Sequence, residues 1–268
     1  MTTPSFHVYG LATPLVRAGD DIATHILAAA ERSESRGIQA GDVVVVAESA
    51  VATAEGRATR LADIEPSAEA LRLAEDYHMD PRLVEVVLRE SDQVVGGIPG
   101  FLLCMTNGTL LPNAGIDASN APPGFVVPLP ADPDVSAQRI RAAIAERSGA
   151  DVAVIVIDSR THAMRLGSSG VAIGCSGIPS VLDERGKADL FGRELEVTKR
   201  AVADCIASAA ELVMGEAGEC VPAAVVRGIG LLVGDYTGVA TIDASECLFM
   251  GVALHADPSL LVDSKREP

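Results

Sequence analysis

Phe101-Leu-Leu-Cys-Met-Thr106, followed by Asn107-Gly108 and then by Thr109-Leu-Leu111, is the stretch that decides the fold class of this chain. Two apolar runs joined by Asn-Gly are typical of a β-hairpin with a type I′ turn, in which both central residues take positive φ. A hairpin pairs its strands antiparallel. The stretch therefore predicts an α+β fold with mixed, partly antiparallel sheets and flanking helices, in preference to a purely parallel doubly wound sheet.

The hydrophobic pattern on either side of the hairpin predicts the other elements. Short β-branched or apolar runs indicate buried strands, and apolar residues at helical spacing indicate helices. Asp134 or Ser136 is expected to cap the helix that runs to Glu146. The expected helices are 19–36, 66–77, 81–90, 134–146 and 197–214, and the expected strands besides the hairpin are 42–47, 125–129, 151–157 and 221–229.

The composition is that of a folded acidic protein. The chain has 268 residues, of which 48% are hydrophobic and 3% aromatic, and its formal net charge is −16. A length of this order suits a single unit over residues 1–255, or two interleaved subdomains, followed by a loosely held tail at 256–268. The charge and the scarcity of aromatic residues exclude a nucleic-acid-binding surface, which needs a dense basic footprint.

Cysteine usage and hydropathy bear on location. The five cysteines form no CxxC pair, so neither a zinc knuckle nor a disulfide framework is indicated. The N-terminus lacks the pattern of a signal peptide, and the apolar runs are much shorter than the roughly 20 residues that span a bilayer. We therefore expect a cytoplasmic protein without a membrane partner.

Three acidic segments are candidates for a site. Asp117 lies among small residues directly after the hairpin, where it can hold a hard cation or simply form an Asx-turn. Asp158 ends an apolar strand, and Glu216 follows a helix that ends near Gly215, although each also suits a capped turn or a surface loop. Together, the three acidic segments indicate a nucleotide and metal site. They do not identify a reaction, because the common phosphate-loop, hydrolase and dinucleotide motifs are missing from the sequence.

In their order and spacing over roughly residues 8–230, these and other segments resemble the coenzyme F-420 γ-glutamyl ligases, which add glutamate to a deazaflavin cofactor. The matching stretches are Gly19-Asp-Asp21, Gly41-Asp-Val-Val-Val-Val46, Ala54-Glu-Gly-Arg57, Asn113 to Asn120, Asp132-Pro-Asp-Val-Ser-Ala137, Ile157-Asp-Ser159, Gly170-Val-Ala-Ile-Gly174, Gly192-Arg-Glu-Leu-Glu-Val-Thr198, Ala203-Asp204, Met214-Gly-Glu216 and Pro222-Ala-Ala-Val-Val-Arg-Gly228.

The resemblance implies an intertwined α+β homodimer that uses GTP as a co-substrate and two divalent ions, Mn²⁺ or Mg²⁺. The implied partners are GTP, L-glutamate and a carboxylate acceptor such as coenzyme F-420-0. GTP would phosphorylate the acceptor carboxylate, and the amine of glutamate would displace the phosphate from the resulting acyl phosphate. Two metal ions suit such a site because they neutralise the triphosphate and align the attack.

The resemblance also implies roles for particular residues. The implied metal ligands are Asp117, Asp158, Ser159 and Glu216. The implied catalytic residues are Asp117, Asp158 and Arg165. The implied nucleotide contacts are Pro14, Leu15, Ser49, Arg57, Asn120, Gly218, Glu219 and Val221.

The chain departs from the family pattern around the phosphates. Thr53 stands where the family has a nucleotide-binding Lys, and Glu48 replaces a small polar residue. Thr161 and His162 replace a Gly and an Arg after the strand that ends at Asp158. Arg57 and Arg165 could compensate for the missing cation, although Arg and Lys are not interchangeable. Two alternatives therefore stay open: a diverged ligase with another nucleotide, acceptor or amino acid, and a non-catalytic binding homologue.

Overall fold

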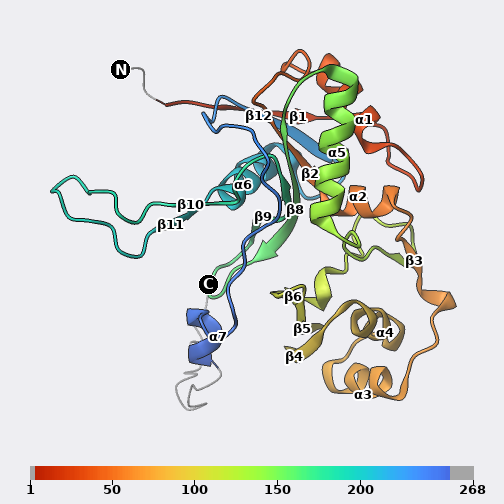
Figure 1. The fold of residues 1–268 in the computed structure, drawn as a ribbon. Helices are drawn as coiled ribbons and strands as arrows, with labels where there is room; N and C mark the ends of the chain where they lie inside the picture. The colour runs from red at the N-terminus through yellow and green to blue at the C-terminus, as the bar shows by residue number, and fades with distance from the viewer. Residues whose placement is uncertain (1–3, 254–268) are drawn as a thin grey trace.

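The computed structural model describes residues 4–253, so the expected tail at 256–268 lies outside the described residues. A mixed sheet with the strand order β1-β12-β2-β8-β9 forms the larger part of the molecule (Figure 1). Its strands are β1 (His7–Leu11), β12 (Ala223–Arg227), β2 (Val43–Ala47), β8 (Ala153–Thr161) and β9 (Ser168–Ser176). β2 and β8 run parallel, whereas the other neighbours pair antiparallel.

Helices cover both faces of this sheet. α1 (Ile22–Arg32) and α5 (Pro133–Ser148) pack on one face, and α6 (Val202–Met214) packs on the other (Figure 1). The four consecutive valines of β2 serve both faces, because successive side chains of a strand point to opposite sides. Val44 and Val46 belong to the core under α1 and α5, while Val43 and Val45 belong to the core under α6.

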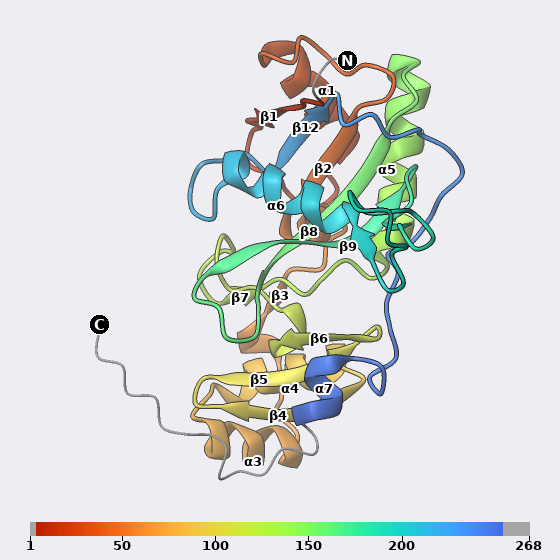
Figure 2. The same cartoon turned by 90° about the vertical axis from the view of Figure 1, so that its left-hand side faces the viewer.

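A smaller part is built on the hairpin from which the fold class was predicted. Its sheet has the order β4-β5-β6, and two helices lie beside it in both views (Figures 1 and 2). Asn107 and Gly108, at the turn, have φ of 49° and 72°. These positive φ values are what the type I′ prediction requires. The elements are β4 (Gln93–Ile98), β5 (Phe101–Thr106), β6 (Thr109–Pro112), α3 (Ala68–Tyr77) and α4 (Pro81–Glu90).

Short elements connect the two parts or extend from them. β10 and β11 form a two-stranded ladder whose connecting segment projects away from the sheet (Figure 1). No helix within residues 4–253 is long and apolar enough to cross a membrane. The short elements are α2 (Glu48–Ala54), β3 (Thr59–Arg60), η1 (Leu61–Asp63), η2 (Asn113–Gly115), β7 (Phe125–Val126), β10 (Val181–Asp183), β11 (Lys199–Ala201) and α7 (Leu248–Ala253).

The structure confirms the α+β prediction and corrects several boundaries. The helix expected from 134 is α5, which begins at Pro133 with Asp132 as its N-cap, because the Asp132 carboxylate accepts a hydrogen bond from the Val135 N–H at 3.0 Å. Asp134 instead accepts from the Cys175 N–H at 2.8 Å. The strand expected over 125–129 ends at Val126.

Two further boundaries are shorter than the sequence predicts. The helix expected over 197–214 begins only at Val202, because residues 199–201 pair with residues 181–183 as β11. The helix expected over 19–36 is confined to α1, since the Asp21 side chain caps its start and Ser33 ends it.

Two glycines of β9 let both helix layers approach it closely. A Cβ on Gly174 would lie 2.2 Å from the carbonyl oxygen of Pro133 at the start of α5. A Cβ on Gly170 would lie 2.6 Å from the carbonyl oxygen of Ala207 in α6. Any side chain at either position would force these backbones apart, so the glycines fix the positions of α5 and α6 beside the end of β8.

Candidate active site

A cavity of about 960 Å³ opens where the parallel pairing of β2 and β8 ends, at Ala47 opposite Ile157. The next residue on each segment is Glu48, which begins α2, and Asp158, which lies within β8 where this strand continues past β2. Because the two strands are parallel, both residues lie at the same end of the paired region, and both line the cavity. The carboxyl ends of strands are where open α/β sheets commonly bind ligands.

Three more carboxylates reach this cavity from other elements. Asp117 follows η2 in a loop that pairs with Val127 through two backbone hydrogen bonds of 2.9 and 2.8 Å. Glu211 belongs to the last turn of α6, and Glu216 follows Gly215, the C-cap residue of that helix. The cavity thus brings together carboxylates from distant parts of the chain, from Glu48 to Glu216, which are about 170 positions apart.

Burial and mutual repulsion disfavour the charged forms of these groups. Burial raises the pKa of Glu48 well above its ordinary value, and the charge on Asp158 raises it further. Burial also raises the pKa of Asp158, although the Arg160 guanidinium opposes that effect. Burial and a hydrogen bond with Glu216 raise the pKa of Glu211 to about 7. Burial and the neighbouring carboxylates therefore favour the neutral forms of these three groups as long as no cation is bound beside them.

The protein's own groups engage the carboxylates expected to bind metal. Asp117 accepts hydrogen bonds from the N–H of Ser119 at 2.7 Å and from its hydroxyl at 2.7 and 2.8 Å. This contact is the Asx-turn that the sequence left open. Asp158 pairs with the Nε of Arg160 at 3.2 Å. Among residues 4–253, no group of three Asp, Glu, His or Cys side chains is arranged to hold a metal ion.

The cavity brings together most of the residues singled out in the sequence. The expected site residues on its wall are Pro14, Leu15, Ser49, Asp117, Asn120, Asp158, Ser159, Glu216, Gly218 and Val221.

Three of the expected site residues, two nucleotide contacts and one catalytic arginine, do not line this cavity. Arg57 pairs with Glu90 at 2.6 Å, and Glu219 accepts a hydrogen bond from the N–H of Ala217 at 2.8 Å within its own loop. Arg165 lies exposed in the turn between β8 and β9. The structure therefore gives no support to the idea that Arg57 or Arg165 replaces the missing phosphate-binding Lys. Among the described residues, Arg17 and Arg160 are the guanidiniums on the wall, which also includes Thr53.

Sequence reasoning missed two residues of the site, Arg160 and Glu211. Arg160 stands two positions after Asp158 on β8, a spacing that puts both side chains on the same face of a strand. Glu211 is an acidic residue in the last turn of a helix, where the helix dipole disfavours negative charge. Each feature is readable from the sequence once the strand and helix bounds are known.

Comparison with known proteins gives consistent results over most of the chain. The family model described as F420-0:Gamma-glutamyl ligase matches residues 10–228. The coenzyme F420:L-glutamate ligase of Methanopyrus kandleri is 48% identical over 215 residues, which cover 80% of this chain and 83% of that protein. The corresponding enzyme of Methanothermobacter thermautotrophicus is 45% identical over 216 residues, covering 80% of this chain and 85% of the relative. The corresponding enzyme of Archaeoglobus fulgidus is 42% identical over 231 residues, which cover 86% of this chain and 90% of that protein.

Proposed function

Because the chain belongs to the F420-0:gamma-glutamyl ligase family, we propose that it is a coenzyme F420:L-glutamate ligase, which joins L-glutamate to F420-0 in the large cavity. We place the reaction in this cavity because Asp117, Asp158 and Glu216 all line it. The family match spans both parts of the fold, which supports a single catalytic unit.

The donor set of the cavity suits divalent ions. Its carboxylates offer hard oxygen ligands, and burial, together with the neighbouring carboxylates, raises the pKa values of Glu48, Asp158 and Glu211, so a bound cation would favour their ionised forms. We assign Asp117, Asp158 and Glu216, the last with the adjacent loop, to holding Mn²⁺ or Mg²⁺. Bound there, the ions would neutralise the triphosphate and polarise its terminal phosphoryl group.

The remaining wall supports a nucleotide beside these carboxylates. Pro14 and Leu15 border the cavity from the N-terminal side, and Asn120 borders it from the Asp117 loop. The volume of about 960 Å³ lies at the upper end of common ligand sites, so it accommodates GTP together with the reacting end of an acceptor. In the proposed reaction, the acceptor carboxylate takes the terminal phosphoryl group of GTP, and GDP leaves. The amine of glutamate, after losing a proton to solvent or to a carboxylate of the cavity, then attacks the acyl carbon, expels phosphate and releases its second proton as the amide forms.

We further propose that the protein is a homodimer joined through the β10–β11 arm, that is, the two strands β10 and β11 with the segment 184–198 that connects them. Near the far end of the arm, Leu190, Phe191 and Val197 expose 98%, 95% and 85% of their surface. An isolated arm gains nothing from large apolar side chains in water, whereas a second subunit would bury them. Measuring the molar mass of the wild type and of Phe191→Ser in solution tests this assignment; a wild-type monomer would refute it.

The ligase assignment is tested by combining the protein with F420-0, L-glutamate, GTP and Mn²⁺ and measuring the glutamylated product by mass spectrometry. Asp158→Asn should lower turnover by about 100-fold or more, because the change removes a metal-binding carboxylate at the reacting phosphate. Asp76→Asn, on the exposed surface of α3, is the matched control and should retain full activity. Absence of product from the wild type, with GTP or any other nucleoside triphosphate, would refute the assignment.

A further inference from the structure

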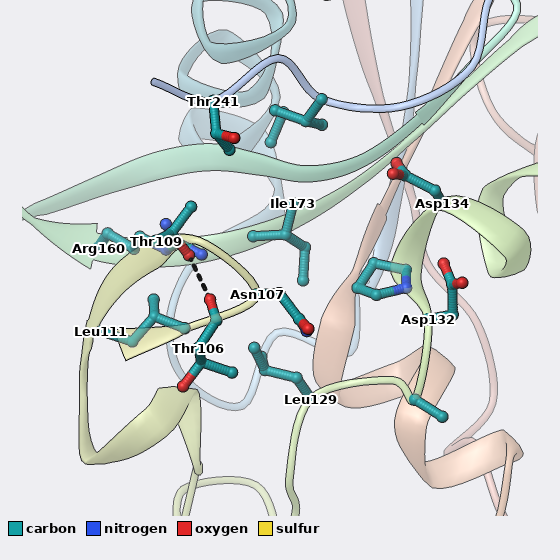
Figure 3. Close-up of a pocket in the computed structure, with 14 residues that line it drawn as sticks. Thr106, Asn107, Thr109, Leu111, Leu129, Asp132, Asp134, Arg160, Ile173 and Thr241 are labelled. Carbon is teal, nitrogen blue, oxygen red and sulfur yellow. Dashed lines mark hydrogen bonds between the residues drawn. The ribbon is translucent and has the colours of Figure 1, made fainter. Parts of the chain in front are cut away.

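A second, smaller cavity of about 290 Å³ lies next to the large one. Asn107 and Thr109 of the hairpin turn border it, together with Ile173 of β9 and Thr241 (Figure 3). Arg160 lines both cavities and thus forms part of the wall between them. A small molecule in this pocket would therefore lie close to the Asp158 side of the proposed active site.

Arg160 is the feature of this wall that points to a ligand. Its side chain is only 13% exposed, and its Nε donates to Asp158 at 3.2 Å. The two terminal nitrogens of the guanidinium donate to no other group among residues 4–253. The two terminal nitrogens of a guanidinium fit the two oxygens of a carboxylate, so they are available to an anion that enters either cavity.

The small pocket has a polarised arrangement of charge. Asp132 and Asp134 lie on the side opposite Arg160, Thr109 and Thr241 lie on the Arg160 side, and Asn107 lies between the two sides (Figure 3). An anionic group is therefore attracted to the Arg160 side and repelled from the start of α5.

Building on the proposed ligase function, we propose that the small pocket receives the side chain of the L-glutamate substrate while Arg160 binds its α-carboxylate. In this orientation the α-ammonium group faces the acidic wall of the large cavity at Asp158, where the acyl group is to be attacked. The γ-carboxylate meets the hydroxyl of Thr241, since the Thr109 hydroxyl already donates to the Thr106 carbonyl oxygen at 3.1 Å. The pocket volume is at the low end for ligand sites, which suits an amino acid and excludes a deazaflavin.

The first test fills the pocket without touching Asp158. Ala131 is exposed at the pocket rim, so Ala131→Phe should block the pocket while leaving the core intact. We expect the KM for glutamate to rise by about 10-fold or more, with the KM for GTP and for F420-0 unchanged. Ala142→Phe, at an exposed position of α5 outside the pocket, is the matched control and should change none of these values. If Ala131→Phe alters the melting temperature, Thr241→Val serves as the second pocket variant.

The second test removes the guanidinium. Arg160→Gln should raise the KM for glutamate by about 10- to 100-fold, the usual cost of losing a hydrogen bond to a charged group. Arg72→Gln, exposed on α3, controls for the loss of a positive charge. A rise confined to the KM for F420-0 would mean that Arg160 binds the acceptor carboxylate, and a rise confined to the KM for GTP would mean that it binds the nucleotide. Either result overturns the glutamate assignment while leaving the ligase function in place.

The sign of the Asp132 effect tests the orientation. Asp132→Asn keeps the side-chain acceptor that caps α5 but removes a charge that repels the γ-carboxylate. The KM for glutamate should fall by roughly 2- to 5-fold, the range for a single exposed charge. A rise would mean that the aspartates bind the ammonium group, which overturns the orientation.

A binding measurement separates this proposal from the ligase function itself. Saturation-transfer NMR should detect L-glutamate on the wild type, with a non-hydrolysable GTP analogue and Mn²⁺ present, and should not detect it on Ala131→Phe. Equal signals from the two proteins, or none from the wild type, would overturn the proposal whether or not the enzyme turns over.

Discussion

Glu211 provides the sharpest test of the electrostatics of the active site. Its pKa lies near 7 in the folded protein, against an ordinary value of 4.5, because burial and the hydrogen bond with Glu216 disfavour its charge. A carboxyl group with a raised pKa binds more protons in the folded state than in the unfolded state, so its stabilising effect is present at low pH and is lost as the pH rises through 7. This direction is opposite to that of a carboxylate held in an ion pair.

The magnitude follows from the displacement of the pKa. About 2.5 pH units at 1.36 kcal/mol each set an upper limit of about 3.4 kcal/mol, and solvent in the open cavity reduces this to about 1 to 2 kcal/mol. Glu211→Gln cannot ionise, and it retains an oxygen that can accept the hydrogen bond from the Gly170 N–H. Relative to the wild type, this variant should therefore gain about 1 to 2 kcal/mol in unfolding free energy between pH 5 and pH 8 in the absence of divalent ions.

Urea unfolding at the two pH values measures this gain directly. Glu75→Gln, at an exposed position of α3, is the matched control and should show no comparable gain. Saturating Mn²⁺ should abolish most of the difference, because a cation near Glu216 stabilises the ionised form of Glu211. A Glu211→Gln effect that is the same at pH 5 and pH 8, or a variant that loses stability as the pH rises, would refute the reasoning.

Three further predictions concern stability and nucleotide binding. Asp42→Ala should lower the unfolding free energy in urea by about 3 to 5 kcal/mol, because it leaves the Arg227 guanidinium without the carboxylate that it contacts at 2.8 and 2.7 Å; a loss below about 1 kcal/mol would contradict this. Gly174→Ala should cost more than about 1 kcal/mol by the same measurement, since its Cβ would lie 2.2 Å from the Pro133 carbonyl oxygen, and a variant as stable as the wild type would show that α5 can move away. Thr53→Lys should lower the Kd for GTP by about 10-fold in calorimetry, because it adds a cation to the wall of the large cavity; unchanged affinity would mean that the phosphates bind elsewhere.

Local sequence patterns sufficed for most of the fold because the elements concerned carry their own signals. The Asn107-Gly108 turn defines a hairpin by its backbone requirement, and the four β-branched valines of β2 favour a strand buried on both faces, as the structure shows. β11 could not be predicted in this way. Lys199, Arg200 and Ala201 are not strand formers, and they are extended because residues 181–183 pair with them.

The site was predictable to the extent that its residues follow strands or helices. Asp158 and Glu216 were readable because Asp158 follows the apolar run 151–157 and Glu216 follows the glycine that ends α6, whereas the choice between a turn and a ligand at Asp117 was not decidable from one sequence. The structure shows that the Asx-turn exists and that Asp117 nevertheless lines the cavity. Arg160 was not predicted because its position between two cavities depends on the tertiary arrangement that brings the hairpin turn and Ile173 of β9 to the same small cavity, which no local sequence pattern encodes.

The engagement of the carboxylates by protein groups has a consequence for how the proposed enzyme would assemble its complex. Arg160 neutralises part of the charge on Asp158 in the fold described here. An ion bound at Asp158 would supply that neutralisation and leave the guanidinium free to bind an anionic substrate from the small pocket. Linkage is reciprocal, so a substrate anion that draws Arg160 away from Asp158 must strengthen the binding of the ion by the same factor. A single, largely buried arginine shared by two cavities can in this way couple the loading of metal to the loading of the amino acid.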